Sequence, residues 1–202
     1  MDAKDGFIAG ALGAPGRCRM PNVRRTGHPS KVGSMTFTFK PLMREDLPML
    51  HEWLHRPHVR QWWREPSTIT ELERDYFQPS ADPPTRAYIA MRDDIPVGFI
   101  QSYIVSGSGG GWWTNETDPG ARGIDQFLAN AAELGQGMGR AMIGAFIDRL
   151  FEDPLVTSVQ SDPAPDNERA IRSYRGAGFT TIGDVDTPDG RATLMRTHRA
   201  VR

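Results

Sequence analysis

The chain has little cysteine, no metal-ligand spacing and no long apolar run. The single Cys18 cannot form an internal disulfide and argues against a cysteine nucleophile. His51 and His55 are four residues apart, but a metal site would need further ligands. No apolar run approaches the length of a membrane span, and no serine–histidine–acid order indicates a hydrolase. We therefore expect no metal and no membrane partner, and a cytoplasmic location.

Charge divides the chain unevenly. Residues 1–34 contain six Lys/Arg against two Asp/Glu, and the remainder contains 18 against 23. An acidic body disfavours nucleic acid and suits a cationic small molecule. Residues 1–34 are predicted to be a disordered basic extension, with a short nucleic-acid-binding arm as the alternative, and Met35 is a possible natural start. Residues 35–202 are predicted to form one domain.

Apolar periodicity alternates between strand and helix spacing in the predicted domain. Strands are expected at 36–42, 86–91, 97–106, 123–129, 156–161, 179–185 and 192–197. Helices are expected at 46–55, after Pro57, and at 70–77, 138–151 and 166–176, and a turn at 93–96. This order indicates an α/β (α+β) fold with a single sheet flanked by helices.

A glycine turn, Gly135-Gln136-Gly137-Met138-Gly139, precedes the helix expected at 138–151. A helix N-terminus carries unpaired N–H groups and partial positive charge, and glycines let an anion approach the backbone. The turn could therefore hold a pyrophosphate. It lacks the Gly-Lys-Ser/Thr of a P-loop and the spacing of a dinucleotide fingerprint. The alternative is a turn that merely packs a helix on a sheet.

Two motifs occur in the order found in the GNAT N-acetyltransferases, which the chain resembles. The glycine turn is similar to the pattern Gln/Arg-x-x-Gly-x-Gly/Ala, although Leu134 stands at the first position. The segment Asn167–Phe179 is similar to N-x-x-A-x-x-x-Y-x-x-x-G-F. The resemblance implies a mixed sheet in which two central parallel strands splay apart, with the thioester of acetyl-CoA in the gap.

More narrowly, Trp62-Trp63, Gln101-Ser102-Tyr103 and Thr187-Pro188-Asp189-Gly190 resemble the aminoglycoside 6'-N-acetyltransferases. This likeness extends from about Met35 to the C-terminus. It implies direct acetyl transfer from acetyl-CoA to the 6'-amino group of an aminoglycoside in a ternary complex, which would confer antibiotic resistance. Monomer and homodimer both remain open.

The cosubstrate site implied by these motifs consists of the backbone N–H groups of Gln136, Gly137, Met138, Gly139 and Arg140, together with the Asn167 side chain. Asn167 could instead be a helix cap. Asp125 is the candidate base, because an apolar strand should raise its pKa. A structural ion pair with Arg122 and a purely electrostatic role are the alternatives.

Tyr174 is the candidate acid for the departing thiolate, or else a core side chain. For the acceptor, carboxylates should bind the cation and aromatic rings should contact the sugars. The candidate carboxylates are Asp125, Glu116, Asp118, Asp162 and Glu133. The candidate aromatic walls are Trp53, Tyr103, Trp112 and Trp113.

Two other functions fit the sequence. One is a siderophore-type N-acyltransferase acting on lysine or hydroxylamine groups, which does not require an acidic pocket. The other is a non-catalytic acetyl-CoA-binding module. The joint presence of Asp125, Asn167 and Tyr174 argues against the second.

Overall fold

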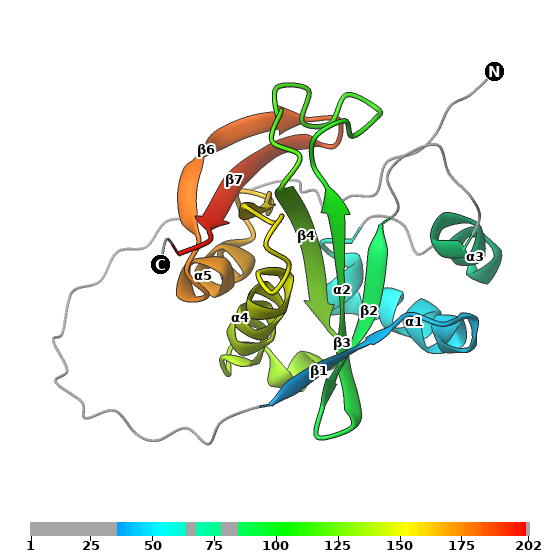
Figure 1. Ribbon diagram of the computed structural model, residues 1–202. Coiled ribbons are helices and arrows are strands. Elements are labelled where there is room, and N and C mark those ends of the chain that lie inside the picture. The colour runs from blue at the N-terminus through cyan, green and yellow to red at the C-terminus, as the bar shows by residue number, and fades with distance from the viewer. Residues whose placement is uncertain (1–35, 64–67, 78–84, 201–202) are drawn as a thin grey trace, which may run out of the picture.

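Seven strands form one sheet in the computed structural model, which describes residues 36–63, 68–77 and 85–200 (Figure 1). The sheet order is β1-β2-β3-β4-β5-β7-β6. The strands are β1 (Phe37–Pro41), β2 (Arg86–Arg92), β3 (Ile95–Ile104), β4 (Ala121–Leu128), β5 (Ser158–Ser161), β6 (Thr180–Thr187) and β7 (Gly190–His198). These are the seven strands expected from the sequence. The predicted extension, residues 1–34, lies outside the described residues.

Several strand boundaries differ from the prediction by one or two residues, and the start of β3 is one of them. Ile95 and Pro96, expected in a turn, belong to β3, where Ile95 pairs with Arg92. The turn is shorter because Asp93 and Asp94 both adopt positive φ, 50° and 62°. Two consecutive residues of this kind close a two-residue hairpin, and Asp tolerates the conformation better than most residues.

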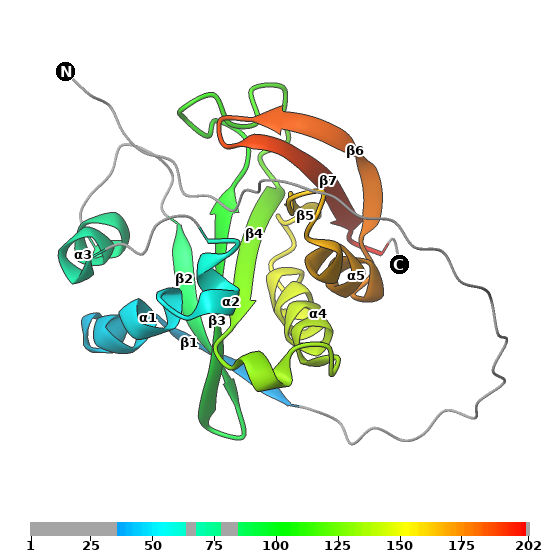
Figure 2. The ribbon, with the colours of Figure 1, turned by 180° about the vertical axis from the view of Figure 1, so that it is seen from behind.

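The helices cover both faces of the sheet (Figures 1 and 2). They are α1 (Leu47–Leu54), α2 (Pro57–Arg60), α3 (Ile69–Phe77), α4 (Met138–Leu150) and α5 (Glu168–Gly176), with 3-10 turns at Arg44–Asp46 and Ala131–Glu133. None of the helices in the described ranges has the length and apolar composition of a membrane span.

Side chains alternate along each strand and so divide the core in two. Ile100 and Leu128 pack in the cluster that contains α4 and α5. Phe99 and Phe127, one residue earlier in each strand, pack in the cluster that contains α1, α2 and α3. Each residue of β3 and β4 can therefore be assigned to one face.

β4 and β5 form the one parallel pair in the described sheet, and they soon part. Their register joins Ala121 to Ser158 and ends where Gly123 meets Gln160. β4 continues to Leu128, while β5 ends at Ser161 and Pro163 follows shortly after. Pro163 has no N–H for a ladder. The splayed parallel strands expected from the resemblance are confirmed.

Candidate active site

A pocket of about 420 Å³ lies where β4 and β5 part. Its lining combines the second half of β4 with α2, the glycine turn, the end of β5 and α5. Among the lining residues are His58, Trp62, Trp63, Asp125, Gln126, Gly135, Gly137, Gly139, Arg140, Ser161, Asp162, Asn167 and Tyr174. Most of the predicted cosubstrate and catalytic residues thus share one pocket.

The glycine turn has the geometry that an anion site needs. Gly135 and Gly137 have φ of 76° and 83°, and a Cβ on either would meet open space. Gly137 is the N-cap of α4, and no side chain there caps the first turn. The N–H groups that begin α4 are therefore suited to a phosphate.

The other predicted cosubstrate residues are placed as follows. The Gln136 side chain donates to the Ala132 carbonyl at 2.5 Å, and the Met138 side chain is buried in the core. Both could then contribute through backbone N–H groups. Asn167 caps α5, because its Oδ1 accepts from the Ala170 N–H at 3.1 Å, and it also lines the pocket.

Asp125 is half-buried in β4, and its Oδ2 accepts from Gln101 Nε2 at 2.9 Å. Burial raises the pKa of Asp125 to about 6, although the Gln101 hydrogen bond lowers it. Arg122, the expected ion-pair alternative, donates to the Pro119 and Ala121 carbonyls at 2.8 and 3.1 Å. The carboxylate is therefore more basic than an ordinary aspartate.

Asp162 follows β5 directly and lines the same pocket. Burial raises its pKa to about 8, and the negative charges of Asp125 and Asp189 contribute to the rise. Asp189, which lies in the turn between β6 and β7, is not among the predicted site residues. A cation in this acidic region would stabilise the charged forms of all three carboxylates.

Tyr174 is 3% exposed on α5 and contacts Phe179 edge to face, with ring centroids 5.1 Å apart. It also lines the pocket. Burial, followed by the charge of Asp125, raises the pKa of Tyr174 well above its ordinary value. The hydroxyl thus keeps its proton at neutral pH, as a general acid must.

The aromatic walls differ from the expectation. Trp53 is 4% exposed and contacts Phe127, with centroids 6.5 Å apart, so it lies behind the pocket. Trp62 and Trp63 line the pocket instead. An aromatic residue on a short amphipathic helix can point into the core or into a pocket. The apolar pattern of α1 did not distinguish these two positions for Trp53.

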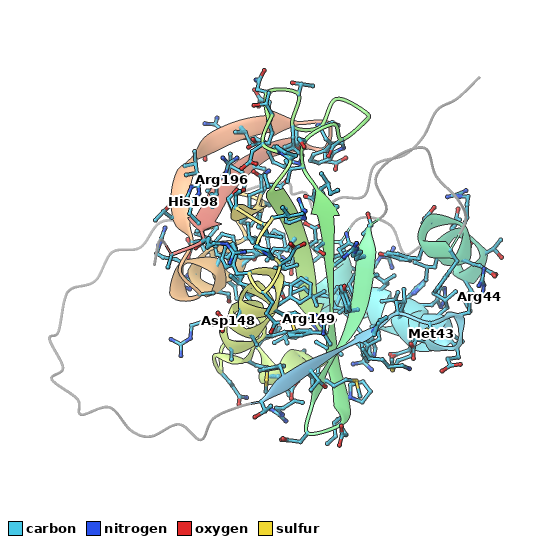
Figure 3. All side chains as sticks on the ribbon, in the orientation of Figure 1. Met43, Arg44, Asp148, Arg149, Arg196 and His198 are labelled. Carbon is cyan, nitrogen blue, oxygen red and sulfur yellow. The ribbon has the colours of Figure 1, made fainter. Side chains whose placement is uncertain are left out.

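Three of the predicted acceptor carboxylates have other partners. Glu116 pairs with Arg196 of β7, which Figure 3 labels, at 2.6 Å. Arg196 also donates to Gln160 Oε1 at 2.6 Å. Asp118 accepts from the Thr157 hydroxyl at 2.5 Å. Glu133 pairs with Arg92 at 3.5 Å. Glu116 and Asp118 thereby anchor the loop that leads into β4.

That loop, 105–120, carries Trp112 and Trp113, which are half-buried with ring centroids 5.9 Å apart. Neither lines the pocket directly. Trp113 lies beside Tyr103. Burial raises the pKa of Tyr103, the charges of Asp125 and Asp162 raise it further, and Trp113 lowers it. The Tyr103 hydroxyl thus lies near both carboxylates.

Gly123 leaves room for Tyr103. A Cβ at Gly123 would lie 2.2 Å from Tyr103 Cζ, well inside van der Waals contact. We expect Gly123→Ala to displace the ring and lower the free energy of unfolding by about 1–3 kcal/mol. Urea unfolding measures this. The matched control is Gly144→Ala in α4, where a Cβ meets nothing within 4 Å and the helix should gain stability. Equal effects of the two substitutions would contradict the steric explanation.

The two histidines at the end of α1 lie close together but form no metal site with the other described residues. His51 lies on α1 and His55 directly follows it, and their ring centroids are 4.3 Å apart. Within the described ranges, no group of three or more His, Cys, Asp or Glu residues could hold a metal ion.

Comparison with known proteins identifies the family. A model described as an acetyltransferase (GNAT) domain matches residues 43–187. The chain is 48% identical over 163 residues to aminoglycoside N(6')-acetyltransferase type 1 of Klebsiella pneumoniae, covering 78% of this chain and 81% of that protein. It is 57% identical over 86 residues to a kanamycin resistance protein of Rhizobium radiobacter, covering 43% and 80%.

The solved structures agree with the sequence comparison. The fold matches the crystal structure of aminoglycoside acetyltransferase AAC(6')-Ib in complex with coenzyme A and kanamycin, with a TM-score of 0.77 and 48% identity. The match covers 81% of this chain and 95% of that one. The chain therefore belongs to the GNAT acetyltransferases and, within them, to the aminoglycoside 6'-N-acetyltransferase family.

Proposed function

We propose that this protein transfers the acetyl group of acetyl-CoA directly to the 6'-amino group of aminoglycosides, within a ternary complex, and so confers resistance. One observation carries the proposal: a single pocket joins an anion-binding helix N-terminus to two half-buried carboxylates with raised pKa. The helix N-terminus suits a pyrophosphate, and the two carboxylates suit a polycationic amine. Since acetyl-CoA is available in the cytoplasm, we propose that the enzyme acts there. The proposal is compatible with a monomer and with a homodimer.

The glycine turn and α5 would form the donor side of the pocket, which is the part that binds acetyl-CoA. The N–H groups of Gly137, Met138, Gly139 and Arg140 would hold the pyrophosphate, because they begin α4 without a side-chain cap. Asn167 lies beside this turn in the pocket lining and would contact the coenzyme arm. Arg140 adds a positive charge on the same side.

Proton transfer is assigned to Asp125 and Tyr174. An ammonium group cannot attack a thioester until it loses a proton, and Asp125 would accept it, directly or through water. The neutral amine then attacks the carbonyl carbon, and a backbone N–H of β4 would stabilise the oxyanion. As the carbon–sulfur bond breaks, Tyr174 would donate its proton to the departing sulfur. The nitrogen would then lose its second proton to the tyrosinate, which gives the amide and restores Tyr174.

Release of thiol from acetyl-CoA tests the function. We expect rapid release with kanamycin, slow release with a hydroxylamine or free lysine, and little release without an acceptor. Mass spectrometry and NMR of the product should place the acetyl group on the 6'-nitrogen. Faster release with the hydroxylamine would favour a siderophore-type acyltransferase. Binding of acetyl-CoA without turnover of any acceptor would favour a non-catalytic module.

Asp162→Asn tests the acceptor side of the pocket. Because it removes one carboxylate facing the cation, we expect the KM for a 6'-amino aminoglycoside to rise about tenfold while the KM for acetyl-CoA barely changes. Added salt should weaken acceptor binding in the wild type, because screening reduces charge–charge attraction. Steady-state kinetics with each substrate varied measures both effects.

The control is Asp148→Asn, which removes an exposed carboxylate from α4 (Figure 3). Its kinetics should match the wild type. An analogue with a 6'-hydroxyl in place of the amine should bind but turn over poorly. Equal acceptor KM values for Asp162→Asn and the wild type would remove Asp162 from the acceptor site, and normal acetylation of the analogue would contradict the 6'-assignment.

A further inference from the structure

A chain of two hydrogen bonds connects Asp125 to α3. The Tyr76 hydroxyl donates to Gln101 Oε1 at 3.0 Å, and Gln101 Nε2 donates to Asp125 Oδ2 at 2.9 Å. The three side chains come from α3, β3 and β4. Tyr76 is absent from the pocket lining, and its hydrogen bond to Gln101 connects it to the site.

The sheet register brings these residues to one face. Gln101 is the Cα partner of Asp125 in the β3–β4 pair, so both side chains lie on the same side of the sheet. Phe99 and Phe127 share that side, which α3 covers. The Tyr76 ring contacts Phe99 edge to face, with centroids 5.9 Å apart. The hydroxyl is thus held beside Gln101 by apolar packing.

The direction of the hydrogen bonds matters because an amide has one accepting and one donating end. Gln101 is 1% exposed, so water cannot substitute for a lost protein partner. While the Tyr76 hydroxyl donates to Oε1, Nε2 faces Asp125. A half-turn of the amide would place Oε1 against the carboxylate, where two oxygens would repel each other.

We propose that Tyr76 is a positioning residue for Asp125, acting through the amide of Gln101. Its hydroxyl donates to the accepting end of that amide, and the amide, held in this way, keeps the carboxylate charged and directed toward the amine substrate. This inference rests on the proposed role of Asp125. Burial raises the pKa of Tyr76 well above its ordinary value, as do the charges of Asp125 and Asp75, so Tyr76 remains a donor throughout the working range.

Several other groups affect the charge of Asp125. Tyr103 on β3 and Tyr174 on α5 keep their protons, and Asp162 is a second acid of raised pKa. The remaining titratable or charged groups that line the pocket are His58, Arg140, Arg169 and Arg172. Tyr76→Phe leaves all of these groups in place, so a change in the pH profile would report on the hydrogen-bond chain.

Tyr76→Phe keeps the ring and removes the hydroxyl. We expect kcat/KM for the aminoglycoside to fall about three- to tenfold at neutral pH, in line with one lost hydrogen bond. The acid limb of the pH profile should move to higher pH, because the amide of Gln101, which donates to the carboxylate, is no longer held by Tyr76 and stabilises the charged form less. The KM for acetyl-CoA should stay constant, since the donor side of the pocket is untouched.

Two further variants separate positioning from packing. Tyr88→Phe is the matched control, because Tyr88 lies on the other face of the sheet, where its ring centroid is 5.4 Å from that of Phe146. The pH profile of this variant should match the wild type. Gln101→Leu should shift the acid limb at least as far as Tyr76→Phe. The double variant Tyr76→Phe/Gln101→Leu should be no worse than Gln101→Leu alone, since Tyr76 would act through Gln101.

The outcomes separate this inference from the role of Asp125. An unchanged acid limb in Tyr76→Phe, or additive losses in the double variant, would overturn the inference and leave the role of Asp125 intact. A lowered melting temperature with a normal pH profile would make Tyr76 a packing residue and also overturn it. Wild-type turnover in Asp125→Asn would overturn both. Carbon-13 NMR of the aspartate carboxyls, with Asp125→Asn identifying the resonance, reads the titration without turnover.

Discussion

Asp125→Asn is expected to lower kcat for aminoglycoside acetylation by about a hundredfold or more, the usual contribution of a general base. Asparagine has nearly the same shape, and its oxygen can still accept from Gln101. The loss would therefore report the missing charge and basicity. Steady-state kinetics at neutral pH measures it, with Asp148→Asn as the surface control. Near-wild-type turnover would remove Asp125 from the chemistry.

The pH dependence gives this prediction a sign. The base must be ionised to accept a proton, so kcat/KM of the wild type should rise with pH through the raised pKa of Asp125, about 6. Asp125→Asn should lose this acid limb. A profile that keeps the same limb in the variant would assign the titration to another group, with Asp162 the next candidate.

Stability should depend on pH with the opposite sign. A carboxyl group whose pKa is higher in the folded state than in the unfolded state stabilises the fold fully below its unfolded value, near 4, and this contribution is lost as pH rises through the folded value. For Asp125 and Asp162 that window runs from about pH 4 to their raised values. The ligand-free wild type should therefore be less stable at neutral pH than Asp125→Asn or Asp162→Asn.

Tyr174→Phe is expected to lower kcat by about tenfold to a hundredfold, because the departing sulfur would leave without a proton donor. The ring stays against Phe179, so the melting temperature should barely move. The KM for the aminoglycoside should also change little. Kinetics normalised to folded protein, together with a thermal scan, checks both parts. A clear loss of stability with normal turnover per folded molecule would make Tyr174 a core side chain alone.

The fold could largely be predicted from local pattern. Alternating apolar residues marked the strands, and the glycine turn marked the start of α4 at Met138. β5 is shorter than expected, because the Val156 N–H bonds to the Asp153 carbonyl in a turn, and the strand begins at Ser158. Strand propensity alone cannot reveal such a competing local hydrogen bond.

The site was harder to predict, because its contacts join distant segments. The position of Asp162 after a strand indicated the pocket, but nothing local to Tyr76 or Gln101 indicates that they contact each other across 25 positions. Glu116 is a comparable case, because its partner Arg196 lies 80 positions away. The type of a residue determines its chemistry, whereas the packing of distant segments determines which residues it contacts.

Where β4 separates from β5, the two faces of β4 have different neighbours. Beyond Gly123, odd-numbered Asp125 lies on the face with Gln101, while even-numbered Ile124 and Leu128 pack on the face with Tyr174. The side chains of the eight-residue strand β4 therefore alternate between the face of Asp125 and the face of Tyr174. A substitution in β4 changes one face of the sheet and leaves the other unchanged. A single inserted residue would move every later side chain of the strand to the opposite face.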